Sequence, residues 1–135
     1  MTKTAPREQE RIVTLCGSHR FKDTFEEVAQ ALGLSGWIVL RPAFAKDAHE
    51  YALPTEGMKG LKQILDELHF KKIAMSQVVV VINQDGYMGE STKKEVAEAE
   101  RLGKKIFWFQ DRLDSWKDLL TYDARIHLPL WMGAL

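Results

Sequence analysis

The most constraining feature of the chain is the run Val78-Val79-Val80-Val81-Ile82, which is apolar at every position. β-Branched residues favour extended backbone, so the run predicts a strand. A strand with apolar side chains on both faces is typical of the middle of a parallel sheet that has helices above and below it. The run is also too short to cross a bilayer as a helix. We therefore expect an α/β protein built around this strand.

Short apolar runs alternate with helical patterns along the rest of the chain. Further strands are predicted at residues 12–16, 37–40 and 106–109. Helices are predicted from apolar residues at helical spacing or from a closing glycine: Phe21 to Leu32, a stretch marked by Leu61, Ile64, Leu65 and Leu68, Thr92 to Leu102, and a short one around Trp116 to Leu120. This order predicts a single-domain open parallel sheet, a flavodoxin-like or Rossmann-like three-layer sandwich.

Length and composition limit what such a domain binds. The 135 residues suit one domain, which we place at residues 11–135 after a flexible N-terminal tail at residues 1–10. Lys plus Arg equals Asp plus Glu at 19 each, so neither polymeric nucleic acid nor a membrane is an expected partner. Cys16 is the single cysteine, and the four histidines show no metal-ligand spacing with it. We expect a cytoplasmic protein with no metal or other cofactor.

Ligands of open parallel sheets bind beyond the carboxyl ends of the strands, where three loops are expected to meet. These loops are residues 17–21, the segment from Arg41 onward, and residues 83–91. The second is long enough to be a binding loop or lid, or else a disordered excursion. In the first, Gly17, Ser18, Arg20 and the following helix N-terminus suit a phosphate or another anion. Alternatively, Ser18 is an ordinary helix cap and Arg20 a solvated residue.

The loop after the central strand has the composition of a pocket for a sugar and a flat base. It carries two glycines, the aromatic Tyr87 and several carboxylates within residues 83–95. Its Thr92-x-x-Glu95 spacing also matches a capping box, in which both side chains only satisfy backbone N–H groups. On spacing alone, the capping box is the better interpretation.

Three segments together resemble a known family. They are Leu-Cys-Gly-Ser-x-Arg-Phe at residues 15–21, Glu-Leu-His-x-x-Lys-Ile at residues 67–73, and Asn-x-x-Gly-Tyr-x-Gly-Glu-Ser-Thr-x-x-Glu at residues 83–95. They look like the nucleoside 2-deoxyribosyltransferase-like superfamily, which includes nucleoside 5′-monophosphate N-glycosidases. The resemblance covers about residues 12–109, and its third segment is the specific one.

The resemblance implies an enzyme with Glu95 as nucleophile. In the superfamily, a glutamate at the matching position attacks the anomeric carbon, displaces the base and forms a covalent glycosyl-enzyme, which water or another base resolves. The expected substrate is a small nucleoside or nucleoside 5′-monophosphate, and Ser18 and Arg20 favour the monophosphate and hydrolysis. Relatives are commonly oligomeric, so we expect a homodimer. The apolar tail at residues 126–135 is expected to pack on the domain or on the second subunit.

The chain departs from the superfamily at one catalytic position. Relatives carry an aspartate about eight residues ahead of the central strand, where this chain has His69. Eight helical residues rise roughly 12 Å, against roughly 16 Å for a five-residue strand, so His69 could lie near Glu95. Its imidazole could transfer a proton near neutrality, or it could simply close the apolar face of its helix. Asp85 is a second candidate acid, with a turn-forming role as the alternative.

Substrate contacts are expected from the first and third loops, with Tyr87 stacking on the base or lining the ribose. The expected binding residues are Gly17, Ser18, Arg20, Phe21, Asn83, Gly86, Tyr87, Gly89, Ser91 and Thr92. A competing hypothesis is a non-catalytic module that binds or senses nucleotides. The missing aspartate at position 69 is the argument for it.

Overall fold

The computed structural model describes residues 11–47 and 58–120, and within them it contains a four-stranded parallel sheet. The strands are β1 (Ile12–Gly17), β2 (Ile38–Leu40), β3 (Val78–Ile82) and β4 (Lys105–Trp108), in the order β2-β1-β3-β4. All five residues of β3 are buried. The predicted open parallel α/β sheet of flavodoxin-like or Rossmann-like type is therefore confirmed, with β3 inside the sheet.

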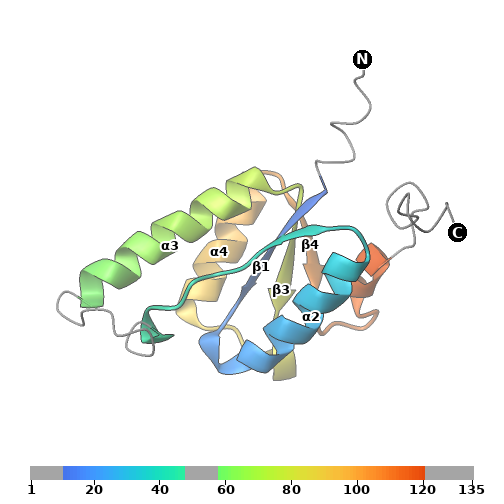
Figure 1. Ribbon diagram of the computed structural model, residues 1–135, viewed down its shortest axis with the longest axis horizontal. Coiled ribbons are helices and arrows are strands. Elements are labelled where there is room, and N and C mark those ends of the chain that lie inside the picture. The colour runs from blue at the N-terminus through green and yellow to red at the C-terminus, as the bar shows by residue number, and fades with distance from the viewer. Residues whose placement is uncertain (1–10, 48–57, 121–135) are drawn as a thin grey trace, which may run out of the picture.

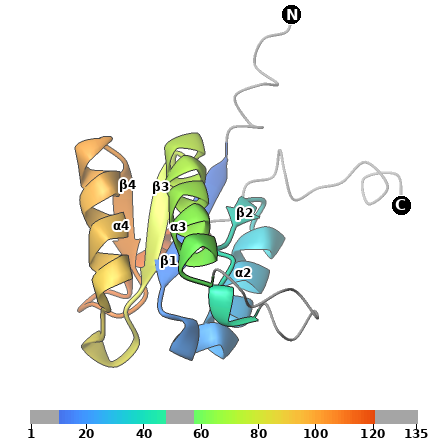
Figure 2. The ribbon, with the colours of Figure 1, turned by 90° about the vertical axis from the view of Figure 1, so that its left-hand side faces the viewer.

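Helices cover both faces of the sheet (Figures 1 and 2). One face carries α2 (Lys22–Leu34), and the other carries α3 (Met58–Met75) and α4 (Glu90–Arg101). Short 3-10 turns lie at η1 (His19–Phe21), η3 (Gln84–Gly86) and η4 (Ser115–Leu120). The predicted short helix near residue 116 is this last 3-10 turn.

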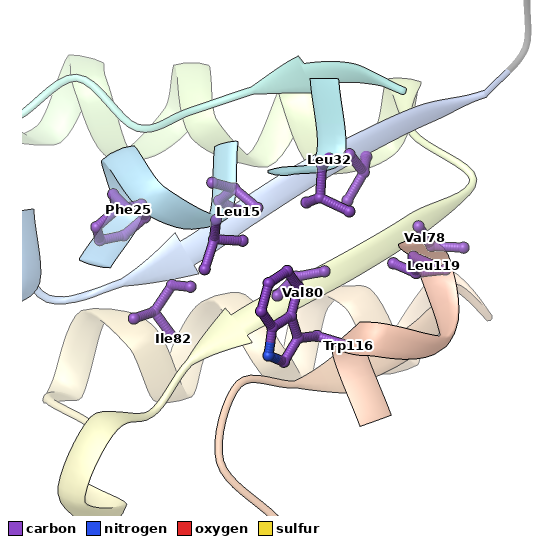
Figure 3. Packing of buried hydrophobic residues seen from close by; sticks show 10 residues of the cluster. Leu15, Phe25, Leu32, Val78, Val80, Ile82, Trp116 and Leu119 are labelled. Carbon is purple, nitrogen blue, oxygen red and sulfur yellow. The ribbon is translucent and has the colours of Figure 1, made fainter. Parts of the chain in front are cut away.

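Alternation along the strands divides the core in two. The first cluster packs β1 and β3 against α2 and η4 through large apolar side chains, among them Leu15, Phe25, Leu32, Val80 and Trp116 (Figure 3). The second, on the α3 and α4 side, is smaller and contains Cys16, Ile73, Val79, Val81, Val96 and Ala99. Successive strand residues point to opposite faces, so Leu15 belongs to the first cluster and Cys16 to the second.

The buried face of α3 differs from the prediction. Ile64 and Leu68 are 62% and 41% exposed, whereas His69 and Ile73 are buried. The helix also extends to Met75, seven residues beyond Leu68. Leu65, His69 and Ile73 follow one another at i, i+4 spacing and form the face of α3 that packs on the sheet. Ile64 and Leu68 lie at the side of that face. His69 thus stands within the buried stripe.

The start of α4 also differs from the prediction. The helix begins at Glu90 after the extended N-cap residue Gly89, two residues before Thr92. Thr92 and Glu95 therefore lie inside the helix, and both are buried. A capping box requires its Ser or Thr at the N-cap, so the interpretation of Thr92 and Glu95 as a cap is wrong.

Several sequence-based expectations fall on residues outside the described ranges. These are the N-terminal tail at residues 1–10, the part of the long loop at residues 48–57, and the apolar tail at residues 126–135. Within residues 11–47 and 58–120, none of the helices combines the length and the apolarity that a membrane span requires.

Candidate functional site

Three buried side chains from three elements meet between α3, α4 and β1. Cys16 Sγ, next to the carboxyl end of β1, lies 3.4 Å from Nε2 of His69 on α3. The same Nε2 lies 3.9 Å from Oε1 of Glu95 on α4. The two helices pack on each other, and both pack on β1. This packing brings the three residues together. The expected proximity of His69 and Glu95 is thereby confirmed.

One oxygen of the buried Glu95 carboxyl group has no hydrogen-bond partner. The residue is 8% exposed, and this oxygen, Oε1, is buried. Buried carboxyl groups normally have their hydrogen bonds satisfied, because an unsatisfied polar atom in a dry interior destabilises the fold. A residue retained at such a cost is a candidate functional group.

Burial controls the protonation of Glu95. Desolvation and, to a lesser extent, the neighbouring charge of Asp66 raise its pKa to about 8, although the Cys16 thiol and Lys62 act in the opposite direction. Glu95 is therefore a mainly protonated acid at neutral pH that ionises in the slightly alkaline range.

His69 does not have the protonation expected from the sequence. Desolvation and, to a lesser extent, the charge of Lys72 lower the pKa of its imidazole to about 4, although Asp66 and the backbone of Leu15 act in the opposite direction. The imidazole is thus neutral near pH 7, and its contact with Glu95 is not an ion pair at that pH. His69 suits hydrogen bonding or ligation better than proton donation near neutrality.

Cys16 was missed by the sequence analysis as a site residue. Its thiol is fully buried, and burial together with Glu95 raises its pKa well above the ordinary value. The signal that the sequence offered was its position in β1: Thr14 and Cys16 are two residues apart in a strand, so both point to the face that carries α3. Consistent with that alternation, Thr14 Oγ1 donates to the carbonyl of Lys72 on α3.

A polar chain joins α3 to the first turn of α4. Lys62 Nζ donates to Asp66 Oδ2 at 2.9 Å and to Ser91 Oγ at 3.2 Å. Asp66 stands three residues before His69, and its charge reaches both His69 and Glu95. A carboxylate therefore lies about one helical turn before His69. The sequence signal was the i, i+3 spacing from Asp66 to His69.

The three predicted loops do meet at the carboxyl edge. The Arg20 guanidinium lies over the Tyr87 ring at 3.7 Å, and the Phe21 ring contacts the same tyrosine edge-on. His19 Nε2 reaches Asp47 Oδ1 of the second loop at 2.9 Å. Arg20 therefore covers one face of the ring that was expected to stack on a base.

Ser18 and the glycines have local structural roles. Ser18 caps η1, because its Oγ accepts from the Arg20 N–H. A Cβ at Gly17 would lie 3.0 Å from side-chain atoms of Ile82 and Phe25, so the close packing of β1 excludes larger residues there. Gly86 takes a left-handed φ of 74°, and a Cβ at Gly89 would lie 3.3 Å from Tyr87 Oη.

Asn83 and Asp85 bind the strand ends together. Asn83 Nδ2 donates to the Gln110 carbonyl, and Asn83 Oδ1 accepts from the Gln110 N–H. Asp85 has a left-handed φ of 58°, and its N–H donates to Gln110 Oε1. Asp85 thus occupies the turn that was the alternative to its role as an acid.

The chain matches no family model and none of the curated proteins. The case for a function therefore depends on the sequence motifs and on the buried cluster described above.

Proposed function

We propose that this protein cleaves the N-glycosidic bond of a nucleoside or nucleoside 5′-monophosphate, with Glu95 as the nucleophile. The observation that carries the proposal is the buried carboxyl group of Glu95, whose Oε1 lacks a hydrogen-bond partner. Because α4 begins at Glu90, Glu95 has no capping role that would account for its position. The sequence resemblance supplies the reaction class.

The proposed reaction has two steps. The ionised carboxylate of Glu95 forms a bond to the anomeric carbon while the bond to the base nitrogen breaks, and the base leaves with the electron pair and takes up a proton. Water or a second base then attacks the same carbon, and Glu95 leaves as the carboxylate. Hydrolysis and base transfer share the first step.

The loop residues support a phosphorylated substrate. Arg20 is exposed and lies on Tyr87 at the carboxyl edge, where its guanidinium can pair with an anion. Expected substrates are therefore 5′-monophosphates in preference to the parent nucleosides.

The direct test is base release from a panel of ribo- and deoxyribonucleosides and their 5′-monophosphates, read by chromatography with and without an added free base. Wild-type protein is expected to liberate or exchange a base, and Glu95→Ala to lose that activity. Glu100→Gln, an exposed glutamate on the same helix, is the matched control. Unchanged release by Glu95→Ala would remove the nucleophile assignment.

The raised pKa of Glu95 favours a second role, in which the protonated residue acts as a general acid toward the leaving base. The pH dependence of kcat/KM separates the two roles. A nucleophile must be ionised, so the rate rises with pH and levels above about 8; a general acid must be protonated, so the rate falls in that range. The nucleophile proposal requires the rising profile.

A non-catalytic nucleotide-binding module is the competing function. Two observations favour it: His69 stands in place of the superfamily aspartate, and Glu95 is mainly protonated at neutral pH. Calorimetric titration with a nucleoside monophosphate distinguishes the cases. Tight binding without base release during long incubation at pH 8.5 would select the binding module and exclude the enzyme.

A further inference from the structure

We propose that Cys16, His69 and Glu95 form a binding site for a zinc-class divalent cation. Each residue offers one ligand atom, and no two of these three atoms are more than 4.8 Å apart. The ligands come from β1, α3 and α4, so the fold assembles a site that residue spacing along the chain did not indicate. The proposal concerns metal binding and stands independently of the glycosidase reaction.

The distances are close to those of a tetrahedral site. With typical zinc bond lengths, a sulfur and a nitrogen ligand are separated by about 3.5 Å, and a nitrogen and an oxygen ligand by about 3.4 Å. The observed separations are 3.4 Å from Cys16 Sγ to His69 Nε2 and 3.9 Å from that nitrogen to Glu95 Oε1. A movement of the Glu95 carboxylate by about 1 Å closes the arrangement.

The ligand chemistry also fits. A thiolate, a neutral imidazole and a carboxylate are the ligand types that zinc prefers. Glu95 Oε1 is buried without a hydrogen-bond partner, and the side chains of His69 and Glu95 are 3% and 10% exposed. Coordination gives this oxygen the partner that it lacks in the protein alone.

Charge is balanced in the proposed site. The thiol of Cys16 and the carboxyl of Glu95 each lose a proton to solvent, so two negative ligands neutralise the divalent ion. Asp66, one turn before His69, adds a nearby negative charge, whereas Lys62 and Lys72 of the same helix oppose the cation. Three protein ligands leave the fourth tetrahedral position for water.

If the protein has the proposed glycosidase activity, metal binding at this site should block it. A carboxylate bound to zinc is held away from the anomeric carbon and its electron pair is engaged, so Glu95 cannot act as nucleophile. Zinc is therefore expected to inhibit base release reversibly, and a chelator to restore it. The site would then act as a metal-sensitive block on the reaction.

The test is titration of the metal-free protein with Co²⁺, which reports thiolate ligation by a charge-transfer absorption band in the near ultraviolet. Cys16 is the single cysteine, so such a band has one possible source. We expect the band and tetrahedral visible bands in the wild type, and their displacement by Zn²⁺. The absence of a thiolate band would overturn the proposal.

Variants identify the other ligands by calorimetric titration with Zn²⁺. Cys16→Ser, His69→Gln and Glu95→Gln are each expected to weaken Zn²⁺ binding at least about 100-fold, beyond the typical effect of losing an outer-shell partner. His19→Gln and Glu100→Gln are the controls, since His19 lies at the loop edge with Asp47 and Glu100 is exposed. Loss of binding in His19→Gln with retention in Cys16→Ser would assign the metal to the surface and refute the site.

Two further readouts keep the outcome clear. Zn²⁺ should raise the Tm of the wild-type protein, which requires no variant to fold; an unchanged Tm at saturating Zn²⁺ contradicts a buried site. Base release is measured separately on chelator-treated protein. A thiolate band without base release refutes the proposed glycosidase alone, whereas base release without a thiolate band refutes the metal site alone.

Discussion

The two faces of the sheet bury different chemistry. On the α2 side, Leu15, Phe25 and Val80 pack with other apolar side chains (Figure 3). On the α3 and α4 side, the apolar cluster is smaller, and the buried polar groups Thr14, His69, Thr92 and Glu95 lie on β1, α3 and α4. Thr14 is satisfied by the Lys72 carbonyl, whereas Oε1 of Glu95 is not satisfied.

This difference separates stability from function within one small sheet. Packed hydrocarbon stabilises the fold through the area it removes from water, whereas a buried carboxyl without a partner destabilises it. Natural proteins keep such groups mainly where activity requires them. Substitutions on the two faces should therefore have opposite consequences.

The largest effect is expected from Glu95→Gln on base release. Loss of the nucleophile should lower kcat on the order of 10³-fold or more, while the fold is retained because glutamine has the shape of a protonated glutamate. Steady-state kinetics at pH 8.5 measure the loss, with Glu100→Gln as control. Activity within about fivefold of wild type would show that Glu95, on the α3 and α4 side of the sheet, is not the nucleophile.

The corresponding substitution on the other face is Phe25→Ala. Phe25 is 2% exposed between α2 and the sheet, so its truncation should lower the free energy of unfolding by about 3 to 5 kcal/mol. Urea denaturation followed by circular dichroism measures the change. A cost below about 1 kcal/mol would show that this face is not the stabilising one.

The pH dependence of the free energy of unfolding should reveal the destabilisation caused by ionising the buried carboxyl group of Glu95. Its folded pKa of about 8 lies above the usual 4.5, so its contribution to stability is fully present below pH 4.5 and is lost as the pH rises through 8. His69 behaves oppositely, because its folded pKa of about 4 lies below 6.5: its contribution is present above pH 6.5 and lost as the pH falls through 4.

Glu95→Gln removes the first of these effects. Relative to wild type, the variant should gain stability between pH 5 and pH 9, on the order of 4 kcal/mol. Asp66, Lys62, Cys16 and His69 face the carboxyl group and are the same in both proteins. Urea denaturation at the two pH values measures the difference, and equal stability changes in both proteins would show that Glu95 is not desolvated.

The smallest effect is expected at Asn83. Asn83→Ala removes two hydrogen bonds to the Gln110 backbone in a partly exposed position, which should cost about 1 kcal/mol of stability. Denaturant unfolding measures it. A loss above about 3 kcal/mol would show that the loops at the carboxyl edge stabilise the fold about as much as the apolar face on the α2 side does.

The strands and their parallel arrangement followed from local sequence, because β-branched runs such as Val78 to Ile82 specify buried strands. The buried face of α3 did not, since Ile64 and Leu68 have the same helical periodicity as Leu65 but meet solvent. The start of α4 was also hidden, because its N-cap is Gly89, which has no side-chain signal, while Thr92 resembles a cap.

The candidate site was predictable only in part. The motif context made Glu95 a candidate, and the rise of the helix and of the strand predicted that His69 could lie near it; the 3.9 Å contact confirms that proximity. The participation of Cys16 depends on strand register, and Asp66 approaches through helix packing, so neither appears as a motif in the chain. The neutral state of His69 follows from burial, which the sequence around position 69 does not specify.

The most direct test of the account is intact-mass analysis of the protein after rapid acid quench of a reaction with a slowly turned-over 2′-fluoro nucleoside monophosphate. We expect an added glycosyl mass that maps to the peptide containing Glu95, in the wild type and in Glu100→Gln but not in Glu95→Gln. Base release without any such adduct, or an adduct that persists in Glu95→Gln, would contradict Glu95 as the nucleophile.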